Sequence, residues 1–88
     1  MQDRETLRHT LKQLLQHETG TSRPELPDSV MLREELGLDS VDLIGLVLQV
    51  ECELHVNLTG EELARLRCVG DVLDLIQHKL ASRQNVAA

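Results

Sequence analysis

The sequence predicts an all-α fold: an antiparallel four-helix bundle of three longer helices and one short helix, with a long loop between helices 1 and 2. Apolar residues recur at helical spacing in three segments, at 3–17, 40–53 and 69–80. Helix-start residues precede the second of these and a further short segment. Connections after the second segment are short, as in helix bundles. The 88 residues form a single domain, whose end at about 82–88 we expect to be a frayed tail.

Composition and charge exclude several classes of function. The chain has no Phe, Tyr or Trp, so its core must be aliphatic, and it lacks the aromatic platforms of single-strand nucleic-acid binders. Its net charge of −6 opposes binding to nucleic acids and anionic membranes and favours partners with basic surfaces. Cys52 and Cys68 have no metal or redox spacing. Because the sequence shows no signal peptide and no membrane-spanning run, we expect a cytoplasmic protein that inserts into no membrane. We also expect it to be a monomer.

The first predicted helix, at 3–17, has one apolar stripe at helical spacing. The stripe consists of Leu7, Leu11, Leu14 and Leu15. Three basic residues lie off it: Arg4, Arg8 and Lys12. Gly20 is expected to end the helix. His9 and His17 share no face with a third ligand, so we expect solvated histidines and predict no metal site.

Residues 18–38 are predicted to form the long loop, because they are rich in turn-forming Gly, Pro, Ser and Asp. A loop of this length in a small domain needs anchors or a function. Five apolar residues can provide the anchors: Leu26, Val30, Leu32, Leu36 and Leu38. A single turn of helix is possible at 29–34.

Ser40 stands where this loop becomes the central helix, predicted at 40–53. Asp39 is interpreted as the N-cap and Asp42 as the third helical residue, whose carboxylate can reach back as in a capping box. Ser40 is then the first helical residue, with an exposed side chain. The nearest histidine in sequence, His55, lies beyond the helix, so no catalytic triad can be argued. Ser40 is therefore expected to be a residue that is modified, and no catalytic residue is predicted.

The central helix carries apolar residues on two faces. One stripe has core spacing: Leu43, Leu46, Val47, Val50 and Leu54. The second stripe consists of Val41, Ile44 and Leu48. Such a helix is either fully buried, which is difficult in a small domain, or it docks a partner on its second face. A dimer contact or scattered surface residues would also account for the second stripe.

The short third helix, predicted at 59–65, begins with capping-box spacing between Thr59 and Glu62. Two of its leucines are expected to point inward, Leu63 and Leu66. The last helix, at 69–80, has a clear core face: Val69, Val72, Leu73, Ile76 and Leu80. Cys68 occupies its cap position, where Ser or Thr would be stronger, so a weak cap is expected.

Charge is distributed unevenly along the chain. Between 34 and 62 there are eight acidic residues and no Lys or Arg, and all nine basic residues lie outside this span. The acidic residues are Glu34, Glu35, Asp39, Asp42, Glu51, Glu53, Glu61 and Glu62. A charged run is usually a solvated face. Because this one surrounds Ser40, we favour a docking surface for basic partners, whose approach is guided by long-range attraction.

The motif at the head of the central helix resembles the attachment motif of acyl carrier proteins. It reads Leu36-Gly37-Leu38-Asp39-Ser40-Val41-Asp42-Leu43-Ile44. The resemblance extends from the first helix to about Leu80. It implies that a phosphopantetheinyl transferase moves 4′-phosphopantetheine from coenzyme A to Ser40, and that the thiol of this arm carries acyl groups as thioesters. It also implies a non-catalytic protein whose other partners are acyl-transferring and condensing enzymes with basic docking surfaces.

The resemblance also makes the central helix the one that partners recognise. The expected docking residues are Asp39, Val41, Asp42, Ile44, Leu48 and Glu51.

The chain departs from the fatty-acid type of this family at three positions. Gly45 and Cys52 stand where that type commonly has acids, and Leu54 replaces a usual Phe. Asp39 before the serine disfavours the peptidyl-carrier branch, which usually has Gly-Gly-His-Ser. We therefore expect a discrete carrier of a specialised pathway, such as polyketide or unusual lipid synthesis, rather than of primary fatty-acid synthesis. The alternatives are a peptidyl or aminoacyl carrier and a helical adaptor subunit that carries no modification.

Overall fold

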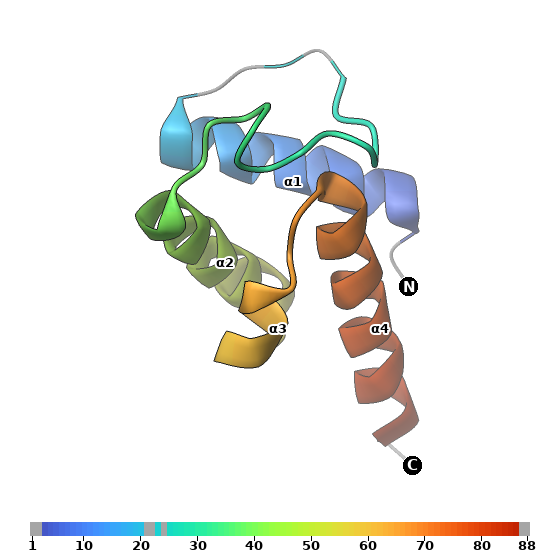
Figure 1. The fold of residues 1–88 in the computed structure, drawn as a ribbon. Helices are drawn as coiled ribbons and strands as arrows, with labels where there is room; N and C mark the ends of the chain where they lie inside the picture. The colour runs from blue at the N-terminus through green and yellow to red at the C-terminus, as the bar shows by residue number, and fades with distance from the viewer. Residues whose placement is uncertain (1–2, 21–22, 24, 87–88) are drawn as a thin grey trace.

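The structure, a computed structural model, describes residues 3–20, 23 and 25–86, with side chains as far as Ala81. Within these residues there are four helices and no strand: α1 (Arg4–Thr19), α2 (Ser40–Leu54), α3 (Gly60–Ala64) and α4 (Val69–Val86). α1 lies across the top of Figure 1 and packs against both α2 and α4, which lie below it. The predicted helical bundle with a long loop between the first two helices is therefore confirmed.

The core of the bundle is aliphatic and draws on α1, α2, α4, the long loop and the segments that flank α3, whereas α3 itself contributes no buried residue. All four leucines of the predicted α1 stripe are buried, as are the five predicted loop anchors and all five core-stripe residues of α2. Leu66 and four of the five predicted core residues of α4 are also buried, whereas Leu63 and Leu80 are partly buried. Among the described residues, no polar or charged residue is buried. Apolar periodicity predicted this core well, because burial of aliphatic surface drives the folding of the chain.

Capping residues set the ends of α1. The Asp3 carboxylate accepts a hydrogen bond from the Thr6 N–H at 2.8 Å, so Asp3 is the N-cap and lies outside the helix. At the other end Gly20, with φ of 75°, donates its N–H to the Gln16 carbonyl at 2.8 Å. The helix therefore covers Arg4–Thr19 rather than the predicted 3–17, and Gly20 ends it as expected.

The other helices differ from their predicted bounds at their ends. α2 ends at Leu54, one residue later than predicted, and α3 is shorter than 59–65 because Thr59 is its N-cap. α4 continues to Val86 rather than ending at residue 80. Residues 82–86, part of the predicted frayed tail, are assigned to the helix, and this stretch contains no Gly or Pro to end it. Residues 87–88 lie outside the described part of the chain.

A hydrogen-bonded turn, not a helix, leads the loop towards α2. The single helical turn considered at 29–34 is replaced by turns at 32–36, and the Gly37 N–H donates to the Arg33 carbonyl at 3.1 Å. Gly37 takes a φ of 70°, which a residue without Cβ adopts freely. This glycine therefore redirects the chain just before the second helix begins.

The long loop also caps α4. The Val69 N–H donates to the Val30 carbonyl at 2.9 Å, and the Gly70 N–H donates to the Asp28 carbonyl at 2.9 Å. The Asp71 carboxylate accepts from the two N–H groups that precede the helix. The N–H groups at the start of a helix have no hydrogen-bond partner within that helix. The loop carbonyls therefore supply the acceptors that the side chain of Cys68, at the cap position, does not provide. The weak cap predicted from Cys68 was based on that residue alone, which gives no information on acceptors from another segment of the chain.

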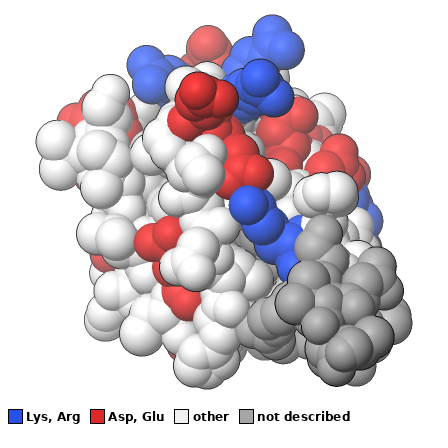
Figure 2. Space-filling view, turned by 90° about the horizontal axis from the view of Figure 1, so that it is seen from below, with Lys and Arg blue, Asp and Glu red and all other residues white. Residues whose placement is uncertain are grey.

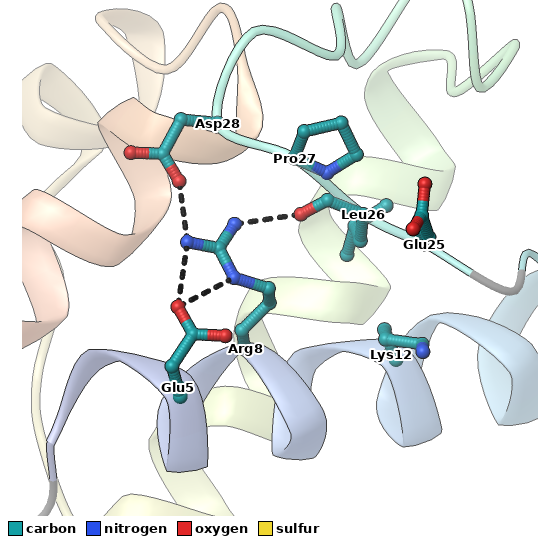
Figure 3. A pocket seen from close by; sticks show the side chains of 7 residues that line it. All are labelled: Glu5, Arg8, Lys12, Glu25, Leu26, Pro27 and Asp28. Carbon is teal, nitrogen blue, oxygen red and sulfur yellow. Dashed lines mark hydrogen bonds and ion pairs between the residues drawn. The ribbon is translucent and has the colours of Figure 1, made fainter.

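Two arginines of α1, Arg4 and Arg8, bind the same loop, and Figure 3 shows the contacts of Arg8. Arg8 Nη1 donates to the Leu26 carbonyl at 2.7 Å, and its Nη2 lies 2.7 Å from Asp28 Oδ1. Arg4 Nη2 lies 2.6 Å from Asp28 Oδ2, and its Nη1 lies 2.7 Å from Asp74 Oδ1 on α4. Hydrogen bonds from Arg4 and then Arg8 hold the pKa of the Asp28 carboxyl below its usual range. The two arginines thus join α1, the loop and α4.

We expect the Asp28→Asn variant to be less sensitive to acid than the wild type. Because folding lowers the pKa of Asp28, its charge stabilises the fold above the unfolded pKa of about 3.9, and this stabilisation disappears as the pH falls through the lower folded pKa. The variant should be less stable at neutral pH and lose less stability below about pH 4. Hydrogen bonds also lower the pKa values of Asp3 and Glu62. The stability of the Asp28→Asn variant should therefore still fall with pH, but with a smaller slope than that of the wild type.

Melting temperatures measured between neutral pH and about pH 2.5 test this expectation. The Glu53→Gln variant, which removes an exposed carboxylate outside the arginine network, is the control. Parallel pH profiles for wild type and Asp28→Asn would contradict the role given to the network.

Candidate functional site

Ser40 is the first residue of α2, and it is exposed. Asp39 is the N-cap, and its Oδ1 accepts a hydrogen bond from the Asp42 N–H at 2.8 Å. Asp42 Oδ2 accepts in turn from the Asp39 N–H at 3.4 Å. The predicted capping box is therefore present, and it uses the carboxylates that flank the serine. The Ser40 hydroxyl takes no part in this cap.

Buried residues on both sides hold Ser40 in place. Leu38 is 3 % exposed, and its N–H donates to the Leu32 carbonyl at 3.0 Å. Leu43 is 4 % exposed, and its N–H donates to the Asp39 carbonyl at 2.9 Å. The core therefore fixes the backbone before and after the serine, and the exposed hydroxyl lies at a defined point of the surface.

Among the residues that the structure describes, no hydrogen bond joins the Ser40 hydroxyl to a histidine or a carboxylate. His55 is the C-cap of α2, and the 15 residues of that helix place His55 about 22 Å from Ser40 along the helix axis. Within the described ranges no group of three His, Cys, Asp or Glu side chains could hold a metal ion. In the same ranges no helix is long and apolar enough to cross a bilayer. Ser40 thus presents an exposed hydroxyl at the start of α2, with no hydrogen-bonded base beside it in the described part of the chain.

The second apolar stripe of α2 is on the surface. Val41 is 76 % exposed, Ile44 47 % and Leu48 58 %, whereas Leu46 on the core side of the same helix is 2 % exposed. Full burial of α2 is thus excluded. The stripe begins beside Ser40 and runs along the first turns of the helix, so a protein that reaches Ser40 must come close to it.

Acidic residues border this stripe, but most of their carboxylates already hold the fold. Asp39 and Asp42 form the capping box, and Glu51 Oε2 accepts a hydrogen bond from the Leu58 N–H at 2.8 Å. Glu51 therefore fixes the connection between α2 and α3 besides lying near the stripe. In Figure 2 the left side of the view, where Figure 1 places α2, is mainly uncharged and acidic, and the Lys and Arg side chains lie along the upper edge and to the right.

One acidic residue at this surface, Glu18, could not be identified from the sequence. A Cβ atom added to Gly45 of α2 would overlap the carboxylate of Glu18, which reaches over from the last turn of α1. Gly45 is thus covered by an acid from another helix. An interior helix glycine can signal close approach of another group, but nothing in the sequence shows which residue approaches.

The Gly45→Ala variant is expected to be more stable than the wild type by about 0.5–1 kcal/mol, because Gly is a poor residue in a helix interior. The atoms it would meet belong to the far end of the exposed Glu18 side chain, which can move aside. Chemical denaturation of both proteins measures the difference. The same substitution in a Glu18→Ala background is the control, since no side chain then has to move. A loss of stability in both backgrounds would show that Gly45 is required by the backbone packing of α2.

Comparisons with known proteins agree with this geometry. The family model described as "Phosphopantetheine attachment site" matches residues 9–76. An acyl carrier protein of Thermotoga maritima is 30% identical over 80 residues, which cover 91% of this chain and 99% of that protein. One from Saccharopolyspora erythraea is 32% identical over 73 residues, 83% of this chain and 77% of that protein. The crystal structure of an acyl carrier protein from Thermotoga maritima superposes with a TM-score of 0.83 at 28% identity, covering 90% of this chain and 92% of that one.

Proposed function

We propose that Ser40 carries the arm of an acyl carrier, from the premise that this chain belongs to the acyl carrier protein family. Members of this family bind 4′-phosphopantetheine covalently and are carriers, not enzymes. The observation that supports Ser40 is its exposed hydroxyl at the first position of α2, outside the capping box that fixes the helix start. When attached, the arm supplies a thiol that forms thioesters, which are more reactive acyl donors than esters of serine itself.

The residues around Ser40 fit such a group. A phosphodiester at this position would lie near the free N–H groups and the positive end of the α2 dipole. The Asp39 and Asp42 carboxylates, which form the cap, keep their charge and would repel the phosphate. Their free oxygens are better placed to attract basic groups of a transferase that delivers the arm.

We assign the partner-docking surface to six residues at the start and along the exposed side of α2. They are Asp39, Val41, Asp42, Ile44, Leu48 and Glu51. The partners are a phosphopantetheinyl transferase and the acyl-transferring and condensing enzymes that use the loaded arm. The apolar stripe should set how slowly a partner dissociates, and the acids should set how fast it associates and how salt affects that rate.

The carrier is proposed to act in the cytoplasm, in fatty-acid, polyketide or related lipid biosynthesis. Within this range we favour a specialised pathway. The support is that Gly45 and Cys52 leave the exposed side of α2 less acidic than in the fatty-acid type, and that Leu54 keeps the end of the helix aliphatic.

Mass spectrometry of the protein purified from its native host tests the carrier function. We expect an added 4′-phosphopantetheine that maps to the peptide containing Ser40, and acylated forms that identify the pathway. Aminoacyl forms would instead indicate a peptidyl carrier. An unmodified Ser40 in cells that make other phosphopantetheinylated proteins would favour a helical adaptor.

A further inference from the structure

Gly45 opens a gap in the exposed stripe of α2, and a residue of α1 fills it. Val41, Gly45 and Leu48 are spaced at i, i+4 and i+7, so they lie on one side of the helix. The Glu18 carboxylate occupies the space where the Gly45 side chain would begin. An acidic group therefore lies beside the two most exposed apolar residues of the stripe, although α2 itself has no acid at that position.

The position of Glu18 is not explained by the stability of its own helix. It lies in the last turn of α1, where the dipole favours cations and disfavours a carboxylate. The residue is exposed, and no Lys or Arg of the described chain forms an ion pair with it. Its charge thus provides α1 with no evident stabilisation.

Glu18 also differs from the other acids around the stripe. The carboxylates of Asp39 and Asp42 accept backbone hydrogen bonds in the capping box, and that of Glu51 accepts one from Leu58. Each of these bonds engages one carboxylate oxygen and holds the side chain in one orientation, so a partner's cation meets only the second oxygen, in a fixed position. Glu18 makes no such bond within the described residues, so its carboxylate can turn towards an approaching cation.

We infer that Glu18 belongs to the partner-docking surface of α2 and that its carboxylate, placed over Gly45, pairs with a Lys or Arg of the phosphopantetheinyl transferase. This inference rests on the proposed function, because it assumes that the transferase approaches Ser40 across the exposed stripe. A basic group fits the site by charge, since the eight acids between 34 and 62 already give this part of the chain a negative field without any Lys or Arg.

The test measures kcat/KM for loading by a broad-specificity phosphopantetheinyl transferase with coenzyme A. The Glu18→Gln variant should be loaded with a roughly two- to fivefold lower kcat/KM at low ionic strength, as for the loss of one exposed ion pair. The difference should shrink as sodium chloride is raised to about 0.5 M. The matched control is Glu25→Gln, which removes the same charge from the exposed loop residue seen in Figure 3 and should have little effect. Melting temperatures should stay unchanged for both variants.

A relocated charge gives a second readout. In the Glu18→Gln background, Gly45→Glu places a carboxylate directly on α2 and should restore most of the lost kcat/KM. Equal effects of Glu18→Gln and Glu25→Gln, or no recovery in the double variant, would overturn the inference. If Ser40→Ala abolishes loading in the same assay, the proposed function stands whatever Glu18 does. If Ser40→Ala is still loaded, the proposed function itself is wrong.

Discussion

Replacement of Ser40 by Ala should abolish loading with 4′-phosphopantetheine and leave the fold intact. The side chain is exposed and contributes to neither the core nor the capping box, so the substitution removes no packing and no structural hydrogen bond. Ala is also a slightly better helix former than Ser, so the melting temperature should be equal or marginally higher.

Intact-protein mass spectrometry after incubation with coenzyme A and a transferase measures this outcome. The Ser29→Ala variant, which changes an exposed serine of the long loop, should be loaded like the wild type. A mass increase in the Ser40→Ala variant would place the attachment site at another residue.

The Leu48→Glu variant should keep its helicity and melt near the wild-type temperature, yet be a poor substrate for the transferase. Leu48 is 58 % exposed, so a charge there remains solvated. If it is an anchor of the interface, its loss should cost roughly 1–3 kcal/mol of partner binding. Circular dichroism and the kinetics of loading, measured on the same sample, separate stability from recognition.

Leu46→Glu is the matched control for this experiment, since it makes the same change two residues earlier on the same helix. Leu46 is 2 % exposed, and an unpaired carboxylate at a core position costs several kcal/mol, a large part of the stability of a small domain. This variant should lose its cooperative unfolding transition. A collapse of the Leu48→Glu variant to the same extent would mean that the exposed stripe is needed by the fold and not by partners.

Features governed by local spacing could be predicted from the sequence. The stripe containing Leu7 and Leu11 was found from helical periodicity, and Ser40 and its capping box were found from the residues on either side. The exposed face of α2 was one of several interpretations, because periodicity identifies an apolar face but does not say whether it is covered. The end of α4 was placed too early because no residue there marks a stop.

Features that join distant parts of the chain could not be predicted. Arg4 and Arg8 were known only to lie off the apolar stripe, whereas in the structure they hold the loop and α4 through Asp28. Glu18 and Gly45 meet because two helices cross, and neither residue carries a local signal of the other. Such contacts depend on how the elements pack, which the chemistry of a short sequence window does not contain.

The backbone pairing between the long loop and α4 makes hydrogen exchange a monitor of the serine's surroundings. The amide protons of Val69 and Gly70 are bonded to loop carbonyls, so they can exchange with solvent only when the loop leaves α4. The same loop continues through Leu38 to Ser40. Release of the loop and uncapping of α4 are therefore one opening event, and protection at these two amides reports how rarely the loop that leads to Ser40 separates from α4.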